Sequence, residues 1–134
     1  MKNIILMLIA CLLLTGCATP HIDNDLDNEI VRFSKEIQSY SFESIRVVKE
    51  SSKIKAVDLI GSDDTIVAHL TLPETLSSEF YDIRYENDDL YFIQSVAIDD
   101  ESGIIFSEDA FINMNGLYRV ERIGGHTYSF ATYR

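Results

Sequence analysis

Apolar residues between positions 23 and 40 recur with the spacing of an α-helix. They are separated by four, three, four and three positions, which places them on one helix face. These residues are Leu26, Ile30, Phe33, Ile37 and Tyr40. Asp27 and Glu29 lie near the start of the segment, where acidic side chains favour the positive end of a helix dipole. The pattern predicts one amphipathic helix that packs on a sheet.

After Phe42 the pattern changes to short runs rich in β-branched residues. Three such runs come first, and a segment that predicts a loop or a single helical turn follows them. The runs cover residues 45–49, 54–60 and 65–72, with turns at 51–52 and 61–64, and the following segment covers 73–78.

The register of the next hairpin can be predicted from its side chains. A two-residue turn at Asn87-Asp88 brings apolar residues opposite one another on one face. The expected pairs are Tyr85–Leu90, Ile83–Phe92 and Tyr81–Gln94 on this face, and Glu86–Asp89, Arg84–Tyr91 and Asp82–Ile93 on the other. Val96 and Ile98 continue the apolar face, and a loop over 99–103 returns the chain so that Ile104 and Phe106 face them.

Two glycine-containing turns predict the last hairpins. Asn115-Gly116 is typical of a type I′ turn and sets Met114 opposite Leu117 and Phe111 opposite Val120. Gly124-Gly125 predicts a turn between strands at 118–123 and 126–133. A two-residue turn there places Arg119 and Glu121 on the face of Tyr128 and Phe130, whereas a bulge or a three-residue loop reverses this, so the buried face stays open.

These elements predict an α+β fold, with one N-terminal helix packed on a curled antiparallel β-meander of about seven or eight strands. A sheet of this length is expected to curl around the helix or close toward a barrel, because either limits its open edges. We expect residues 23–134 to form a single domain.

The N-terminal segment is an apolar run that ends at a cysteine. Lys2 gives it a positive start, and the run from Ile4 to Leu14 is shorter than the roughly 20 residues that a membrane-spanning helix needs. The residues Leu14-Thr15-Gly16-Cys17 resemble the lipobox of bacterial lipoproteins. The resemblance implies cleavage after Gly16 and attachment of a diacylglyceryl group to the Cys17 thiol, usually with acylation of the new amino group. It therefore implies a signal peptide over 1–16 and a lipidated tether over 17–22.

Two alternatives exist for this segment. Leu8-Ile9-Ala10-Cys11 also fits a loose lipobox, but it would leave an apolar region below the usual length of about 7 to 15 residues. The segment can also be read as an uncleaved apolar helix. We favour Cys17, which implies a membrane-anchored protein of the cell envelope. By analogy with lipoprotein sorting, Ala18 indicates the outer membrane in a bacterium with two membranes, and the outward face of the plasma membrane in a bacterium with one.

The charge of the chain limits its partners. Removal of residues 1–16 would leave 118 residues with 10 basic and 22 acidic side chains, a formal charge of −12. Such a surface repels nucleic acid and anionic lipid head groups, so membrane contact is expected through the lipid on Cys17. The acidity indicates either simple solubility or a cationic protein or peptide partner. Basic residues gather at the first hairpin, which makes it the candidate membrane-facing side: Arg46, Lys49, Lys53 and Lys55.

No motif predicts catalysis, a metal site or a cofactor. Of the three histidines, His21 lies in the tether, His126 follows a turn, and His69 is expected to be a half-exposed sheet residue. No zinc-ligand spacing occurs, and the acidic turns at 61–64 and 99–103 lack the twelve-residue calcium-loop pattern.

Tyrosines in the C-terminal strands are the candidate partner-binding residues, because tyrosine is enriched at interfaces. They are Tyr118, Tyr128 and Tyr133. We expect a lipid-anchored envelope protein that acts as a non-catalytic binding or interaction module. The alternatives are an envelope hydrolase that uses carboxylates and a structural or assembly lipoprotein.

Overall fold

The computed structural model describes residues 24–96, 100–109, 112 and 116–133 of the 134-residue chain, with the side chains of Ser95, Tyr118 and Tyr133 left aside. The predicted signal peptide, the tether and Cys17 lie outside the described residues. Within them the fold is mixed, with one main helix and eight antiparallel strands in two sheets. This confirms the mixed helix and sheet composition.

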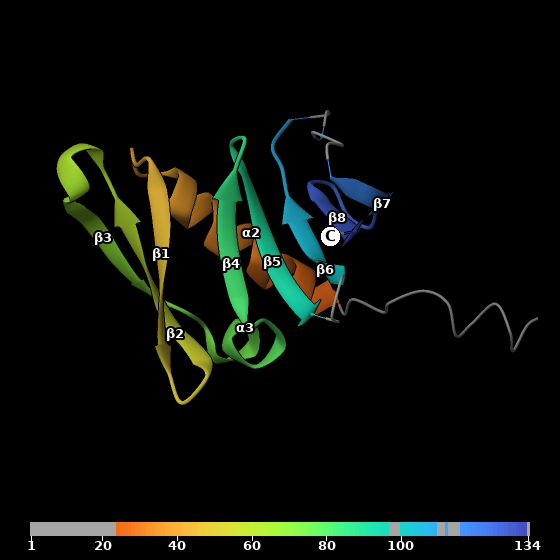
Figure 1. The fold of residues 1–134 in the computed structure, drawn as a ribbon, viewed down its shortest axis with the longest axis horizontal. Helices are drawn as coiled ribbons and strands as arrows, with labels where there is room; N and C mark the ends of the chain where they lie inside the picture. The colour runs from red at the N-terminus through yellow and green to blue at the C-terminus, as the bar shows by residue number, and fades with distance from the viewer. Residues whose placement is uncertain (1–23, 97–99, 110–111, 113–115, 134) are drawn as a thin grey trace, which may run out of the picture.

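The elements follow one another closely along the chain (Figure 1). The helices are α2 (Asn24–Gln38), the short α3 (Glu74–Glu79) and the 3-10 turn η1 (Ser62–Asp64). The first four strands are β1 (Ser44–Glu50), β2 (Lys53–Ile60), β3 (Ile66–Thr71) and β4 (Asp82–Glu86). The others are β5 (Asp89–Val96), β6 (Asp100–Phe106), β7 (Leu117–Arg122) and β8 (Thr127–Tyr133). One sheet has the order β1-β2-β3, and the other has the order β4-β5-β6-β8-β7.

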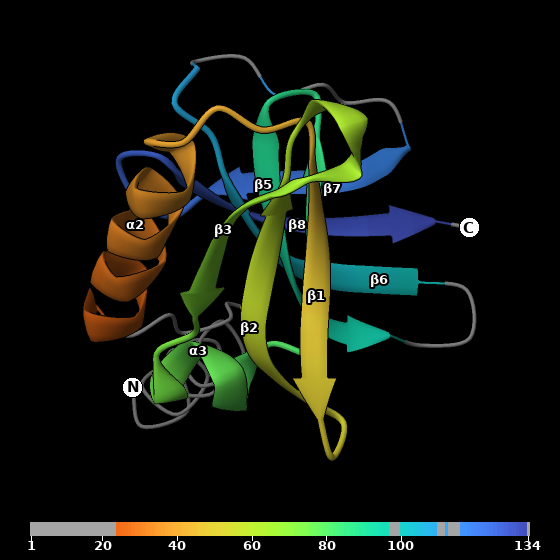
Figure 2. The same ribbon diagram turned by 90° about the vertical axis from the view of Figure 1, so that its left-hand side faces the viewer.

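Helix α2 forms where the apolar spacing predicted it. Ile30, Phe33 and Ile37 are buried, and the first turn carries Asp25 and Asp27. The helix ends at Gln38, so Tyr40 does not continue the buried face and is instead exposed. Figure 2 shows α2 along one side of the fold, with β1 and β2 running steeply across β6 and β8.

The hairpin of β4 and β5 has the predicted register. Ile83 pairs with Phe92 and Tyr85 pairs with Leu90. Asn87 and Asp88 have positive φ angles of 53° and 65°, as a type I′ turn requires. The pairs of Asp82 with Ile93, Arg84 with Tyr91 and Glu86 with Asp89 are also those expected. The expected pair of Tyr81 with Gln94 does not form part of the observed register, because β4 begins at Asp82.

The predicted loop over 99–103 is wrong where it is described, because β6 begins at Asp100 and includes Gly103. A side chain at Gly103 could not be accommodated, since a Cβ there would lie 1.9 Å from the carbonyl oxygen of Phe92. Glycine therefore allows β6 to approach β5 where the register between the two strands shifts. Ile104 and Phe106 pair with Phe92 and Leu90, rather than with Val96 and Ile98 as predicted. Val96 pairs instead with Glu101 and is exposed, and Ile98 lies outside the described residues.

The order of the last strands corrects the predicted meander, because β8 lies between β6 and β7. Gly124-Gly125 does connect β7 to β8, but Val120, rather than Arg119, pairs with Phe130. The amides of Ile123 and Gly124 both donate to the carbonyl of Thr127, so the connection is longer than a two-residue turn. Of the two registers that the sequence left open, the structure has the one with the longer loop. Met114 and Phe111, the expected partners across Asn115-Gly116, lie outside the described residues.

Gly124 also brings the last turn against the start of α2. The Thr127 hydroxyl donates a 2.5 Å hydrogen bond to the carboxylate of Asp27. A Cβ at Gly124 would lie 2.3 Å from this hydroxyl oxygen and 3.0 Å from the carboxylate. The glycine therefore leaves room for the contact that joins α2 to β8.

One main core joins both sheets to both helices. Its fully buried side chains include Ile30 and Ile37 of α2, Leu76 of α3 and Phe92 of β5. A second cluster lies on the other face of the five-stranded sheet and consists of Tyr91, Ile93, Ile105 and Phe130. The side chains of α2 and α3 that do not enter this core are available to line a surface between the two helices.

Candidate functional site: an acidic groove between the helices

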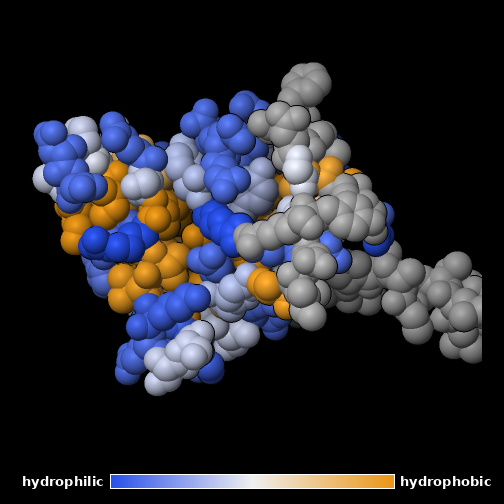
Figure 3. Space-filling view, viewed as in Figure 1, coloured by the Kyte–Doolittle hydropathy of each residue, from blue (hydrophilic) through white to orange (hydrophobic). Residues whose placement is uncertain are grey.

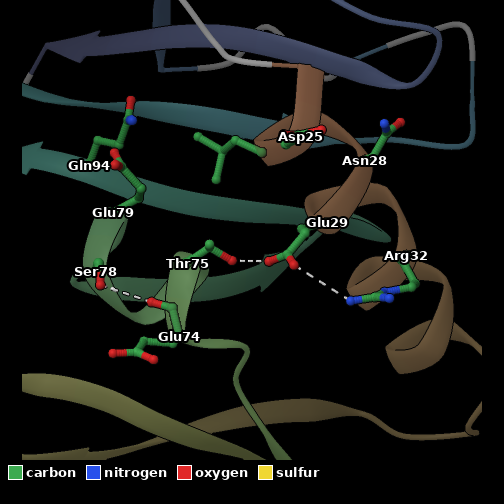
Figure 4. Close-up of a pocket in the computed structure, with 10 residues that line it drawn as sticks. Asp25, Asn28, Glu29, Arg32, Glu74, Thr75, Ser78, Glu79 and Gln94 are labelled. Carbon is green, nitrogen blue, oxygen red and sulfur yellow. Dashed lines mark hydrogen bonds and ion pairs between the residues drawn. The ribbon is translucent and has the colours of Figure 1, made fainter.

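The described residues form a groove of about 900 Å³ between α2 and α3 (Figure 4). Gln94 of β5 contributes to its lining, and all other lining residues come from the two helices. These are Asp25, Leu26, Asn28, Glu29 and Arg32 of α2, and Glu74, Thr75, Ser78 and Glu79 of α3.

The groove residues of α2 share one stripe of the helix. Asp25, Asn28, Glu29 and Arg32 are spaced by three, one and three positions, so they are neighbours on the helix surface. The apolar stripe of the same helix is buried in the main core. Burial of the apolar stripe fixes the rotation of α2 about its axis, and the polar stripe therefore faces the groove.

The orientation of helix α3 is fixed by the residues that it buries in the main core. Leu76 and Phe80 enter the main core, and the Ser77 hydroxyl donates a 2.6 Å hydrogen bond to the carbonyl of Ile54 in β2. Pro73 directly precedes the helix, where its missing N–H costs no helical hydrogen bond. With this side of α3 fixed, Glu74 and Glu79 are left exposed at the groove.

A chain of polar contacts crosses the groove. The Thr75 hydroxyl donates a hydrogen bond to the carboxylate of Glu29, which joins α3 to α2. Glu29 also pairs with Arg32 at 3.6 Å along α2, and the Arg32 side chain is 74% exposed (Figure 4). The contacts set the spacing of the two helices at the level of Glu29.

The groove is strongly acidic. Its lining carries the four carboxylates of Asp25, Glu29, Glu74 and Glu79 and a single guanidinium group, that of Arg32. Within the described part of the chain, Glu74 and Glu79 form no ion pair. Carboxylates held at the rim of a groove attract a cationic group, and Leu26 adds an apolar contact.

A second, smaller cavity of about 300 Å³ lies near the β4–β5 turn. It combines aromatic rings with carboxylates, and the rings of Phe42 and Tyr85 lie 4.7 Å apart. The Tyr85 hydroxyl donates to Asp88 at 3.0 Å. Burial raises the pKa of the Asp89 carboxyl, an effect that a hydrogen bond from Ser107 partly offsets.

His69 lies in a three-residue network on the three-stranded sheet. Its Nδ1 atom lies 2.5 Å from a carboxylate oxygen of Asp58, and Arg46 donates to the other oxygen at 3.2 Å. The hydrogen bond to His69, supported by Arg46, lowers the pKa of Asp58 against the opposing effect of burial. The His69 side chain is 58% exposed, which confirms the predicted half-exposed sheet position. The pairing with Asp58 was missed, although alignment of residues 54–60 with 65–72 would have placed the two opposite each other.

Of the predicted interaction residues, Tyr128 has a described side chain, and it is not part of the groove lining. Tyr128 is half-buried and packs against the second cluster. The side chains of Tyr118 and Tyr133 are not described, and Gly16 and Cys17 lie outside the described residues.

Two of the basic residues at the first hairpin are engaged. Arg46 pairs with Asp58, and the Lys49 ammonium lies 5.3 Å from the centre of the Tyr81 ring. Lys53 and Lys55 are exposed.

The described residues contain no group of three or more His, Cys, Asp or Glu side chains arranged to hold a metal ion. Of the two acidic turns considered from the sequence, the one at 61–64 contains η1, in which Asp63 and Asp64 are exposed.

Comparisons with known proteins give no relative, since no family model, curated protein or solved structure matches this chain. No helix in the described ranges is long and apolar enough to cross a membrane.

Proposed function

We propose that this chain is a lipid-anchored envelope protein that acts as a non-catalytic binding module, and that its α2–α3 groove holds a cationic group of a protein or peptide partner. The observation that carries this proposal is the lining of the groove, with four carboxylates and one guanidinium group. The formal charge of −12 expected for the mature chain supports the same sign of partner over longer distances.

The position of the groove along the chain fits an anchored protein. Asn24 begins α2 seven positions after Cys17, the proposed lipid attachment residue. At about 3.3 Å per residue, an extended tether would span roughly 20 Å. Asp25, in the first turn of α2, already lines the groove. A lipid on Cys17 would therefore hold the groove close to the membrane, within reach of other envelope proteins.

Tyr128 is a weaker candidate for partner binding than the groove. Its side chain packs on the second cluster, whereas Glu74 and Glu79 are exposed. The role of Tyr118, Tyr128 and Tyr133 stays a prediction, secondary to the groove.

We further infer that the two sheets together form one curled sheet around α2, in the strand order β3-β2-β1-β4-β5-β6. The supporting observations are that β1 lies beside β4 and that the Lys49 ammonium sits over the Tyr81 ring, between the two sheets (Figure 1). Strands β7 and β8 extend this curl in reversed order.

The affinity of the full chain for a tetralysine peptide at low salt tests the groove. The variant Glu74→Gln/Glu79→Gln removes two exposed carboxylates from the lining. Exposed ion pairs contribute roughly 0.2–1 kcal/mol each, so we expect about a five-fold loss of affinity. The matched control is Glu43→Gln/Glu50→Gln, which removes two exposed carboxylates outside the groove. Equal losses in the two variants would show that only the overall charge attracts the peptide.

A further inference from the structure

Four strands lie at the edges of the two sheets, namely β1, β3, β4 and β7. An edge strand exposes unpaired backbone N–H and C=O groups, and proteins usually protect it with charged side chains or by covering it. Three of these strands carry at least three charged residues each: Arg46, Lys49 and Glu50 in β1, Asp82, Arg84 and Glu86 in β4, and Arg119, Glu121 and Arg122 in β7. In addition, β1 and β4 lie beside each other (Figure 1).

Strand β3 differs from the other three edges. Its sequence, IVAHLT, contains no Asp, Glu, Lys, Arg or Pro. Among the described strands only β2 pairs with it, and β3 forms the left-hand limit of the fold in Figure 1. Within the described residues, β3 therefore has neither charged side chains of its own nor a second paired strand to protect its edge.

Large apolar side chains are exposed on this strand. Ile66 is 54% exposed and Val67 is 43% exposed. Since successive residues of a strand point to opposite faces, both faces of the edge offer apolar contacts at this point. Figure 3 shows hydrophobic residues gathered over the three-stranded sheet.

Acidic residues lie at both ends of β3. Asp63 and Asp64 precede the strand and are exposed, and the exposed Glu74 follows it after Pro73. In an antiparallel pair of two β3 strands, the acids at one end of each copy would approach the acid at the other end of its partner. This arrangement opposes pairing between copies and favours a segment with basic residues at its ends.

We infer that β3 accepts an extended segment of a partner protein as an added antiparallel strand. The segment would be apolar where it runs along Ile66 and Val67, and would carry Lys or Arg residues near Asp63, Asp64 and Glu74. Backbone hydrogen bonds would supply affinity, and the flanking charges would supply orientation and selectivity. This inference shares Glu74 with the α2–α3 groove, but the groove lining contains no residue of β3 and neither Asp63 nor Asp64.

The test uses the full chain, purified in detergent, and a short synthetic peptide of alternating Val and Thr flanked by lysine pairs. We expect the peptide to slow hydrogen exchange of β3 backbone amides while leaving β7 amides unchanged. The same peptide with glutamate flanks should bind at least ten-fold more weakly. Ile66→Lys should lower the affinity for the lysine-flanked peptide by about ten-fold, because it places a charge on the open edge.

Val96→Lys is the matched control, because Val96 is 53% exposed and lies on β5, in the other sheet from β3. It adds the same charge and should retain the affinity of the unmodified chain, with both variants checked for an unchanged melting midpoint.

The inference is overturned if β3 amides are not protected by the peptide, or if Ile66→Lys and Val96→Lys behave alike. A dimer that forms without peptide and is dissolved by Ile66→Lys would assign the edge to a second copy and would also overturn it. Ile66 lies outside the groove lining, so the comparison of Ile66→Lys with Val96→Lys and the protection of β3 amides remain informative if the groove proposal fails.

Discussion

Arg84 holds the carboxylate of Glu101 with two hydrogen bonds of 2.6 Å each. The two residues lie on β4 and β6, the strands on either side of β5, and Glu101 is only 5% exposed. The paired carboxylate of Glu101 raises the pKa of Arg84, against the effect of burial, so the guanidinium group stays charged. The pair therefore connects the two neighbours of β5 across the five-stranded sheet.

Loss of one member of this pair should destabilise the fold. We expect Arg84→Met to lower the free energy of unfolding by about 2–4 kcal/mol, because it leaves the buried Glu101 carboxylate without its guanidinium partner. The double variant Arg84→Met/Glu101→Met should recover part of the loss. Urea unfolding measures all three free energies, and a double variant whose loss equals or exceeds the sum of the single losses would contradict the pairing.

The packing of α2 on both sheets predicts a large effect at Phe33, which is 2% exposed. Phe33→Ala should cost about 3–5 kcal/mol, as is typical for a buried aromatic side chain. Val96→Ala, at an exposed position, should change stability by less than about 0.5 kcal/mol. If thermal unfolding gave the two variants the same midpoint, α2 would not pack on the sheets through Phe33.

Replacement of the buried Asp89 by asparagine is expected to stabilise the fold. Burial raises the pKa of its carboxyl above 3.8, so the folded state favours the protonated form and loses stability as pH rises through this pKa. Asp89→Asn should therefore be more stable than the unmodified chain at pH 7, with the difference shrinking as pH falls toward 4. Urea unfolding at a series of pH values measures this difference. A variant that is less stable at pH 7 would contradict burial as the dominant influence on Asp89, since Asn can still accept the Ser107 hydrogen bond.

The lipid anchor is tested by the mass of the mature protein from a bacterial membrane fraction. We expect a chain that begins at Cys17 and carries acyl groups. Cys17→Ser should abolish the modification, and Cys11→Ser should leave it unchanged. The opposite pattern would move the attachment to Cys11.

Local patterns in the sequence predicted those parts of the fold that depend on neighbouring residues. The spacing of Ile30, Phe33 and Ile37 identified α2, and the pairing of Ile83 with Phe92 followed from one turn. The position of β8 between β6 and β7 could not be predicted in this way, because β8 pairs with β6 over residues 127–133 and 100–106, which no single turn connects.

The groove could not be predicted from the sequence for a different reason. Glu29 and Thr75 come together from helices 46 positions apart. In the sequence, the acids of each helix resemble an ordinary solvated face. Only the packing of Leu76 and Phe80 into the core turns α3 so that its acids meet those of α2.

The most direct test of recognition in the α2–α3 groove is a backbone amide NMR titration of the full chain with tetralysine at low salt. We expect shifts centred on the first half of α2 and on α3, including Glu29, Thr75 and Glu79. These shifts should weaken as salt rises to physiological strength and the screening length falls to about 8 Å. Shifts centred instead on Asp88 and Asp89 at the second cavity, or spread evenly over all exposed acids, would contradict recognition of the cationic group in the groove.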